Sequence, residues 1–165
     1  MNRADIKRQL LIAVFQQAAK VGRLPAVTVG DVMTPSPLCV KPNLSALDLV
    51  HLFHEKRFRH MLVSEQGRLV GIISDRDVVR LFGTHDAPER EYLEKITAGE
   101  LMSTNLITVQ ATTTLIAAVG LIVDNGISCL PVVSGPEAIG ILTSTDLYLS
   151  LEQLLLSVLT ETAAA

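Results

Sequence analysis

The segment Gly71-Ile72-Ile73-Ser74-Asp75-Arg76-Asp77 returns 69 positions later as Gly140-Ile141-Leu142-Thr143-Ser144-Thr145-Asp146. An internal repeat of this length predicts two copies of one supersecondary unit, each of which needs its neighbour to bury its apolar face. Further identities follow the same offset without a gap: Gly30, Met33, Val40, Val50, Leu52 and Val63 match Gly99, Met102, Val109, Val119, Leu121 and Val132. We therefore expect the two halves to share one fold.

The composition limits the classes of protein to which the chain can belong. At 165 residues and 48% hydrophobic, the chain has the size of one ordinary domain or of two small ones that share a core. Its net charge is −3 and no basic run is present, so we expect no nucleic-acid partner. The apolar stretch Leu147–Leu159 is interrupted by Glu152 and Gln153, so we expect no membrane insertion. Arg3 and Lys7 stand where a signal peptide needs an uninterrupted apolar core, so we expect a cytoplasmic protein.

The pattern of apolar and polar residues divides the chain into five parts. They are an N-terminal amphipathic helix and linker (1–28, the helix over Ala4–Val21), a first repeat (29–82), a connector (83–97), a second repeat (98–147), and a C-terminal helix and tail (148–165).

Each repeat is predicted to run β-α-β-β-α. The first has strands at Leu38–Val40, His60–Ser64 and Leu69–Ser74, a turn at Glu65-Gln66-Gly67, a helix capped by Asn43 that continues to about Lys56, and a helix from about Asp75. The second has strands at Ile107–Val109, Cys129–Val133 and Ala138–Leu142, a helix from about Thr113 to Asp124 that ends at Asn125-Gly126, and a helix after Thr143.

Two segments lie outside this repeat. Leu93 and Ile96 predict a helical turn within the otherwise polar connector. Beyond Leu147 the density of leucine is too high for one face of an isolated helix, so part of this segment should pack on another element or subunit. We therefore expect a homodimer.

Three matched elements resemble the paired CBS (cystathionine-β-synthase-type) domains known as a Bateman module. They are Val32-Met33-Thr34-Pro35 with Leu101-Met102-Ser103-Thr104, Arg59-His60-Met61-Leu62-Val63 with Ser128-Cys129-Leu130-Pro131-Val132, and the two Gly-x-x-(Ser/Thr)-x-x-Asp heptads. The resemblance implies an α+β fold of two intertwined, pseudo-twofold-related units. It also implies two clefts between the repeats that bind an adenosine-containing ligand such as AMP, ADP, ATP or S-adenosylmethionine.

The resemblance assigns roles to residues of both repeats. By that similarity, Ser74 with Asp77, and Thr143 with Asp146, hold the ribose. The backbone of each first strand meets the base, and the residues that begin each second strand lie near phosphates. The remaining candidate binding residues are Leu38, Cys39, Val40, Arg59, His60, Ile72 and Arg76 in the first copy, and Ile107, Thr108, Val109, Ser128, Cys129 and Ile141 in the second.

The heptads allow two interpretations. A carboxylate accepts hydrogen bonds, and the vicinal diol of a ribose offers two donors that one carboxylate can bind together. However, a hydroxyl residue followed three positions later by an acidic one, at a strand-to-helix junction, is also a variant of the capping box and requires no ligand. Both roles remain open for Asp77 and Asp146.

Charge distinguishes the two copies. The first carries basic residues where the second carries neutral ones: Lys56, Arg57, Arg59, His60 and Arg76 correspond to Asn125, Gly126, Ser128, Cys129 and Thr145. Only the first copy offers obvious phosphate partners, although such a cluster can also be a solvated face.

Other residues that could suggest chemistry have simpler interpretations. His51, His54 and Glu55 share a helix but lack a further matching ligand, so we expect no metal site. Met33 and Met102 recur at one repeat position, which predicts packing. Cys39 and Cys129 fall in apolar runs without metal-ligand spacing and are expected to be small core residues.

The sequence thus predicts a non-catalytic regulatory module that binds an adenosyl ligand and signals to an unidentified target protein, with no required cofactor and no catalytic residues. The alternative is a structural oligomerisation or interaction module with unoccupied clefts, whose terminal helices dock on an enzyme or a transporter. A nucleotide hydrolase is a third possibility, which turnover of ATP would reveal.

Overall fold

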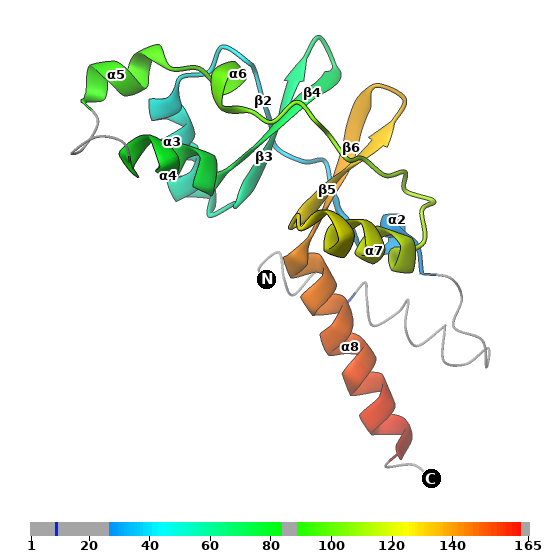
Figure 1. Ribbon diagram of the computed structural model, residues 1–165. Helices are drawn as coiled ribbons and strands as arrows, with labels where there is room; N and C mark the ends of the chain where they lie inside the picture. Colours follow the sequence, from blue (N-terminus) through cyan, green and yellow to red (C-terminus); the bar gives the residue numbers. More distant parts are fainter. Residues whose placement is uncertain (1–8, 10–26, 84–88, 163–165) are drawn as a thin grey trace. The chain divides into compact units, whose positions relative to one another are not determined.

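The computed structural model describes residues 9, 27–83 and 89–162 (Figure 1). The helix predicted over Ala4–Val21 lies outside the described residues except for Gln9, as does part of the connector, 84–88. The described residues form two compact units: unit 1 combines 27–35, 108–134 and 140–162, and unit 2 combines 36–83, 89–107 and 135–139. The structure confirms the predicted mixed fold of two β-α-β-β-α repeats.

Unit 2 contains the strands and helices of the first repeat. In chain order these are β2 (Cys39–Val40), α3 (Ala46–Lys56), β3 (His60–Glu65), β4 (Arg68–Ser74) and α4 (Asp75–Gly83), followed by α5 (Arg90–Lys95) and α6 (Ala98–Leu101). The sheet has the order β2-β3-β4, with β2 parallel and β4 antiparallel to β3. Its core consists of Val40, Leu49, Met61, Val63, Ile73, Val78 and Ala98.

Local chemistry fixes the ends of these elements. The predicted turn is confirmed as a tight hairpin, because Gln66 and Gly67 both have positive φ, at 50° and 79°. The predicted cap of α3 is wrong by two residues: Ser45, not Asn43, accepts a hydrogen bond from the Asp48 backbone N–H at 3.1 Å. A serine hydroxyl at this position satisfies one of the otherwise unpaired amides of the first turn.

Unit 1 contains the second repeat together with the segment that begins the first. Its elements are α2 (Val29–Val32), β1 (Thr34–Pro35), α7 (Leu115–Asn125), β5 (Cys129–Ser134), β6 (Glu137–Thr143), of which the part from Gly140 onward belongs to unit 1, and α8 (Ser144–Thr162). The sheet has the order β1-β6-β5. The strand predicted over Ile107–Val109 is reduced to one bridge between Val109 and Val132, and α7 begins two residues later than predicted because Thr114 is its N-cap.

Each repeat donates its first segment to the sheet of the other repeat. In unit 1, Thr34 pairs with Ile141 across β1 and β6, and in unit 2, Ser103 forms a bridge with Ile72. The short helices α2 and α6 that precede these residues were not predicted. Both begin with a capping box, in which Thr28 pairs with Asp31 and Thr97 with Glu100.

Methionine packing explains the first glycine of each heptad. A Cβ placed on Gly71 would clash with the Met102 side chain, and one on Gly140 would clash with Met33 Sδ. The repeated methionines therefore pack against the repeated glycines, which confirms the packing role predicted for Met33 and Met102.

The two cysteines differ. Cys129 is buried, as predicted, but Cys39 is exposed, so its predicted place in the core is wrong. Strand β2 is only two residues long. Val40 is buried, and because successive residues of a strand face opposite sides, Cys39 lies on the other face.

The predicted turn of the connector is confirmed as α5, which buries Leu93. Within the described residues, none of the helices combines the length and apolarity that crossing a membrane requires.

Candidate functional site

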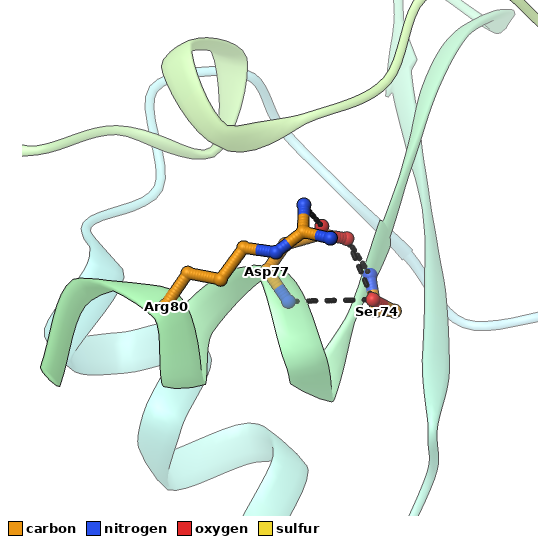
Figure 2. Close-up of polar contacts among 3 residues, drawn as sticks. All are labelled: Ser74, Asp77 and Arg80. Carbon is orange, nitrogen blue, oxygen red and sulfur yellow. Dashed lines mark hydrogen bonds and ion pairs between the residues drawn. The ribbon is translucent and has the colours of Figure 1, made fainter. Parts of the chain in front are cut away.

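The first heptad lies where β4 passes into α4. Asp77 Oδ2 accepts hydrogen bonds from the Ser74 backbone N–H at 2.8 Å and from Ser74 Oγ at 2.6 Å, and the Asp77 N–H donates back to Ser74 Oγ at 3.3 Å (Figure 2). This reciprocal arrangement is a capping box. The inner oxygen of the carboxylate therefore fastens the first turn of the helix to the strand.

The outer oxygen of Asp77 has a different partner. Asp77 Oδ1 accepts a hydrogen bond from Arg80 Nη1 at 3.3 Å, and the two side chains are 27% and 81% exposed (Figure 2). An exposed ion pair in water contributes little stability and is easily exchanged. Asp77 Oδ1 can thus release Arg80 and accept the hydroxyl groups of a ligand while Oδ2 keeps its capping role.

Arg80 is not among the site residues predicted from the sequence. The available signal was its position three residues after Asp77, a spacing that places two side chains on the same face of a helix. Its counterpart in the second repeat is Leu149.

The predicted phosphate residues surround the same junction. His60 begins β3 and pairs with Ser74 on β4, so these two candidate residues lie side by side in the sheet. Arg59 precedes it; its carbonyl accepts a hydrogen bond from the Asp75 N–H at 3.0 Å, and its Nε lies 3.8 Å from Asp75 Oδ2. The side chains of Arg59 and Arg76 are exposed, which leaves both guanidinium groups accessible to a phosphate.

His60 is partly buried. Desolvation lowers its pKa below the usual 6.5, the positive charges of Arg59 and Arg76 act in the same direction, and Asp75 and Asp77 oppose the change. The imidazole is consequently neutral at pH 7 and offers one N–H donor.

The residues expected near the base are placed as follows. Leu62 N–H donates to the carbonyl of Leu38 at 3.2 Å, and Cys39 pairs with Leu62 across β2 and β3. Val40 is only 7% exposed, so its side chain belongs to the core and only its backbone could meet a ligand. Although the residue is exposed, partial desolvation of its sulfur, followed by the charge of Glu137, raises the pKa of the Cys39 thiol, which keeps it protonated at pH 7.

The second heptad has the same junction in unit 1, between β6 and α8. Asp146 Oδ2 accepts hydrogen bonds from the Thr143 N–H at 2.6 Å and from Thr143 Oγ1 at 2.8 Å. Asp146 Oδ1 accepts a further one from Thr34 Oγ1 at 3.2 Å, and Asp146 is only 3% exposed. Its carboxylate is therefore enclosed by protein donors.

The other candidates of the second copy form a less polar surrounding. Val109, Cys129 and Ile141 are buried, and burial raises the pKa of the Cys129 thiol to about 12. Ser128 is held at the junction because its carbonyl accepts hydrogen bonds from the N–H and Oγ of Ser144. Thr108 is exposed, and Ile107 belongs to unit 2.

No cluster of three or more His, Cys, Asp or Glu side chains that could hold a metal ion occurs within 27–83 and 89–162. His51 and His54 are both exposed on α3.

Comparison with known proteins identifies the family of the chain. The sequence model of the CBS domain matches residues 29–83 and 98–152. An uncharacterized protein of Methanocaldococcus jannaschii is 28% identical over 148 residues, which are 89% of this chain and 46% of that protein. The chain spans about half the length of the curated relatives that it matches.

Solved structures of CBS pairs are also similar. CBSX2 of Arabidopsis thaliana in complex with AMP is 30% identical with a TM-score of 0.67, covering 78% of this chain and 98% of that one. The CBS domain pair of protein MJ0100 in complex with 5′-methylthioadenosine and S-adenosyl-L-methionine is 25% identical with a TM-score of 0.66, covering 75% and 94%. The two matched repeats, their heptads and these likenesses together show that the chain belongs to the CBS domain family, as a tandem pair.

Proposed function

We propose that this CBS pair is a regulatory module that binds an adenosine-containing ligand at the first heptad, in unit 2. The observation that carries the proposal is the divided carboxylate of Asp77. Its Oδ2 is fixed by Ser74, whereas its Oδ1 is held, among the residues that the structure describes, by the exposed Arg80, and the Asp77 side chain is 27% exposed. A fixed carboxylate with one accessible oxygen is well suited to bind the diol of a ribose.

The surrounding residues fit the rest of a nucleotide. Arg59 and Arg76 are exposed cations at the same junction, and a guanidinium group binds phosphate oxygens in a fork geometry. The neutral His60 adds one donor beside Ser74. The ligands named for similar CBS pairs, which are AMP, 5′-methylthioadenosine and S-adenosyl-L-methionine, all contain adenosine.

A thermal-shift screen tests this function. The full chain is heated with AMP, ADP, ATP, S-adenosylmethionine and GTP, and at about a hundred times the dissociation constant a true ligand should add about 2.7 kcal/mol to the free energy of unfolding. GTP should stabilise less if the backbone of Leu38–Val40 recognises the edge of the base. Absence of a shift with every adenosyl compound at millimolar concentration would contradict the proposal.

The site itself is tested by calorimetric titration of Asp77→Ala against the best compound of the screen. Loss of hydrogen bonds to a charged acceptor should lower the affinity about ten- to hundredfold. If Asp77 is only a cap, the urea midpoint falls while the affinity stays unchanged. Incubation with ATP under the same conditions should give no turnover if the module is non-catalytic, as proposed.

A specific observation also favours the second candidate function, an oligomerisation or interaction module. Unit 1 exposes large apolar side chains along two helices: Ile116, Val119 and Val123 on α7, and Tyr148, Leu151, Leu155, Leu156 and Leu159 on α8. Surfaces of this kind are typical of protein contacts. We propose a homodimer that uses these helices, which is compatible with ligand binding in unit 2.

Sedimentation at micromolar concentration tests the dimer. The wild type should sediment as a dimer, and Leu151→Asp with Leu155→Asp should shift it to a monomer. Val79→Asp provides the control, because Val79 is exposed to a similar extent on α4 of unit 2. A wild-type monomer, or an equal effect of the control, would contradict this surface.

A further inference from the structure

The carboxylate of Asp146 is engaged on both oxygens by protein donors. Thr143 donates two hydrogen bonds to Oδ2, and Thr34 Oγ1 donates one to Oδ1 at 3.2 Å. Asp146 is 3% exposed, whereas the side chain of Asp77 is 27% exposed. A ribose diol would need the oxygen that Thr34 already occupies.

Thr34 reaches Asp146 because of the exchanged segment. β1 pairs with β6 through Thr34 and Ile141, so the hydroxyl of a residue 112 positions earlier lies at the start of α8. The corresponding residue of unit 2, Ser103, is bound to Ile72 by backbone hydrogen bonds of 2.9 and 3.1 Å. Among the described residues, however, its hydroxyl makes no hydrogen bond to Asp77, whose outer oxygen is paired with Arg80.

The two outer partners differ in how readily a ligand can replace them. Arg80 has a long, exposed side chain, so water can solvate its guanidinium group after it separates from Asp77. Thr34 is part of a strand, and a ribose would have to reach a carboxylate that is only 3% exposed and replace a hydrogen bond already formed inside the protein. Moreover, the positions of Arg59, Arg76 and Arg80 are Ser128, Thr145 and Leu149 in the second copy. These three positions therefore offer no positive charge to pair with an anionic ligand.

We propose, on the basis of the function proposed above, that Thr34 closes the second heptad to ribose. The chain then binds one adenosyl ligand, in unit 2, and the Asp146 carboxylate serves to fasten β1 to the first turn of α8. Thr34 is thus a residue that determines how many ligands the chain accepts.

The first experiment is calorimetric titration of the full chain with AMP, comparing wild type with Asp77→Asn and Asp146→Asn. One AMP should bind per chain, Asp77→Asn should lower the affinity at least about tenfold, and Asp146→Asn should leave it within about twofold. Binding of two AMP molecules to the wild type, or a tenfold loss in Asp146→Asn, would overturn the inference.

The second experiment asks whether the Thr34 hydroxyl is the cause. In the Asp77→Asn background, Thr34→Ala should create a new binding event for adenosine, and a further Asp146→Asn change should abolish it. Thr34→Ser keeps the hydroxyl and should remain closed. No adenosine binding by a folded Thr34→Ala variant, or equal binding by Thr34→Ser, would exclude Thr34 as the closing residue.

The outcomes separate this inference from the proposed function. Two binding sites in the wild type would preserve adenosyl binding and refute closure. Failure of the wild type to bind any adenosyl compound would refute the proposed function, whereas a gain of adenosine binding in Thr34→Ala would still support closure. Circular dichroism establishes that each variant is folded, and the Asp146→Asn titration is decisive even if Thr34→Ala does not fold.

Discussion

Units 1 and 2 carry the same heptad at the same strand-to-helix junction, but they use its carboxylate differently. In both, one oxygen completes a capping box with the residue three positions earlier. In unit 2 the other oxygen pairs with the exposed Arg80, and in unit 1 it accepts the hydroxyl of Thr34 inside the protein. The repeated motif therefore keeps the capping contact in both copies. The partner of the second carboxylate oxygen, and with it the accessibility of that oxygen to a ligand, depends on the neighbouring elements.

The largest effect is expected when unit 2 is given the neutral residues of unit 1. The double variant Arg59→Ser, Arg76→Thr should bind AMP up to about a hundredfold more weakly, which is equivalent to about 2.8 kcal/mol of binding free energy. The reason is that each substitution removes a charge-assisted contact to the phosphate. The affinity for adenosine, which has no phosphate, should remain unchanged in parallel titrations. A similar fall for both compounds would mean that these arginines organise the junction and do not bind phosphate.

A second comparison concerns the glycines that begin the heptads. Gly71→Ala should lower the free energy of unfolding by about 1 to 3 kcal/mol, because the new methyl group would meet the Met102 side chain, including its Cβ at 2.9 Å. Chemical denaturation measures the change.

Met102→Ala provides the partner for a double-mutant cycle. In the Gly71→Ala background, Met102→Ala should lower the free energy of unfolding by less than it does in the wild type, because there it relieves the clash as well as removing the packing contact. Strict additivity of the two changes would show that Met102 does not cause the effect. Gly140→Ala with Met33→Ala repeats the test in unit 1, where the backbone oxygen of Thr34 also lies 3.2 Å from the added Cβ position.

A smaller effect is expected at the ends of α3 and α7. Both helices end on a residue in the left-handed conformation, Arg57 with φ 54° in unit 2 and Gly126 with φ 61° in unit 1. Because only glycine adopts this conformation without steric cost, Arg57→Gly should stabilise the protein and Gly126→Arg should destabilise it, each by about 1 kcal/mol. Urea midpoints of the two reciprocal variants measure this, and changes of the same sign would contradict the explanation.

The smallest effect is expected from the pH dependence of His60. Its pKa in the folded protein is lowered from 6.5, chiefly by burial, so the unfolded chain binds a proton more readily. Its contribution to stability is therefore fully present above pH 6.5 and is lost as the pH falls below that value. His60→Gln should flatten the dependence of the urea midpoint on pH between 6.5 and 5. An unchanged slope would assign the dependence to other groups.

The corresponding residue of unit 1 gives no such signal. Cys129 occupies the matching position, and its pKa of about 12 keeps it neutral throughout this range. If His60 also contacts a phosphate, AMP binding should raise its pKa and take up a proton, so the difference in affinity between wild type and His60→Gln should grow as the pH falls. Titration in two buffers of different ionisation enthalpy measures that proton uptake.

The order of elements and most of the local geometry could be predicted from the sequence. The 69-residue offset identified both repeats, and the alternation of apolar residues placed β3, β4, β5 and β6 within a residue or two. These features depend on neighbours close in the chain, such as the positive φ of Gly67 or the αL end of α7 at Gly126. Errors at this level were small, as when Ser45 rather than Asn43 capped α3.

The candidate site could be predicted only in part. The motif placed Ser74, Asp77 and His60 at one junction, and the structure brings them together there. Arg80 was not predicted, because it lies outside the heptad and only the folded helix shows that its side chain turns back to Asp77. The exposure of Cys39 also differed from expectation, since a two-residue strand has no alternation from which burial can be inferred.

The repeat in the sequence is enough to predict two copies of one β-α-β-β-α unit, each with a hydroxyl and a carboxylate at a helix start. Which carboxylate is more exposed depends instead on long-range packing, because the exchanged segment pairs Thr34 with Ile141 and places its hydroxyl 3.2 Å from Asp146 Oδ1. Hydrogen bonding along a helix is encoded by residues three or four apart, and the pattern of residue types reveals it. A contact across 112 positions leaves no local pattern, since its energy arises only when the folded backbone brings two distant segments together.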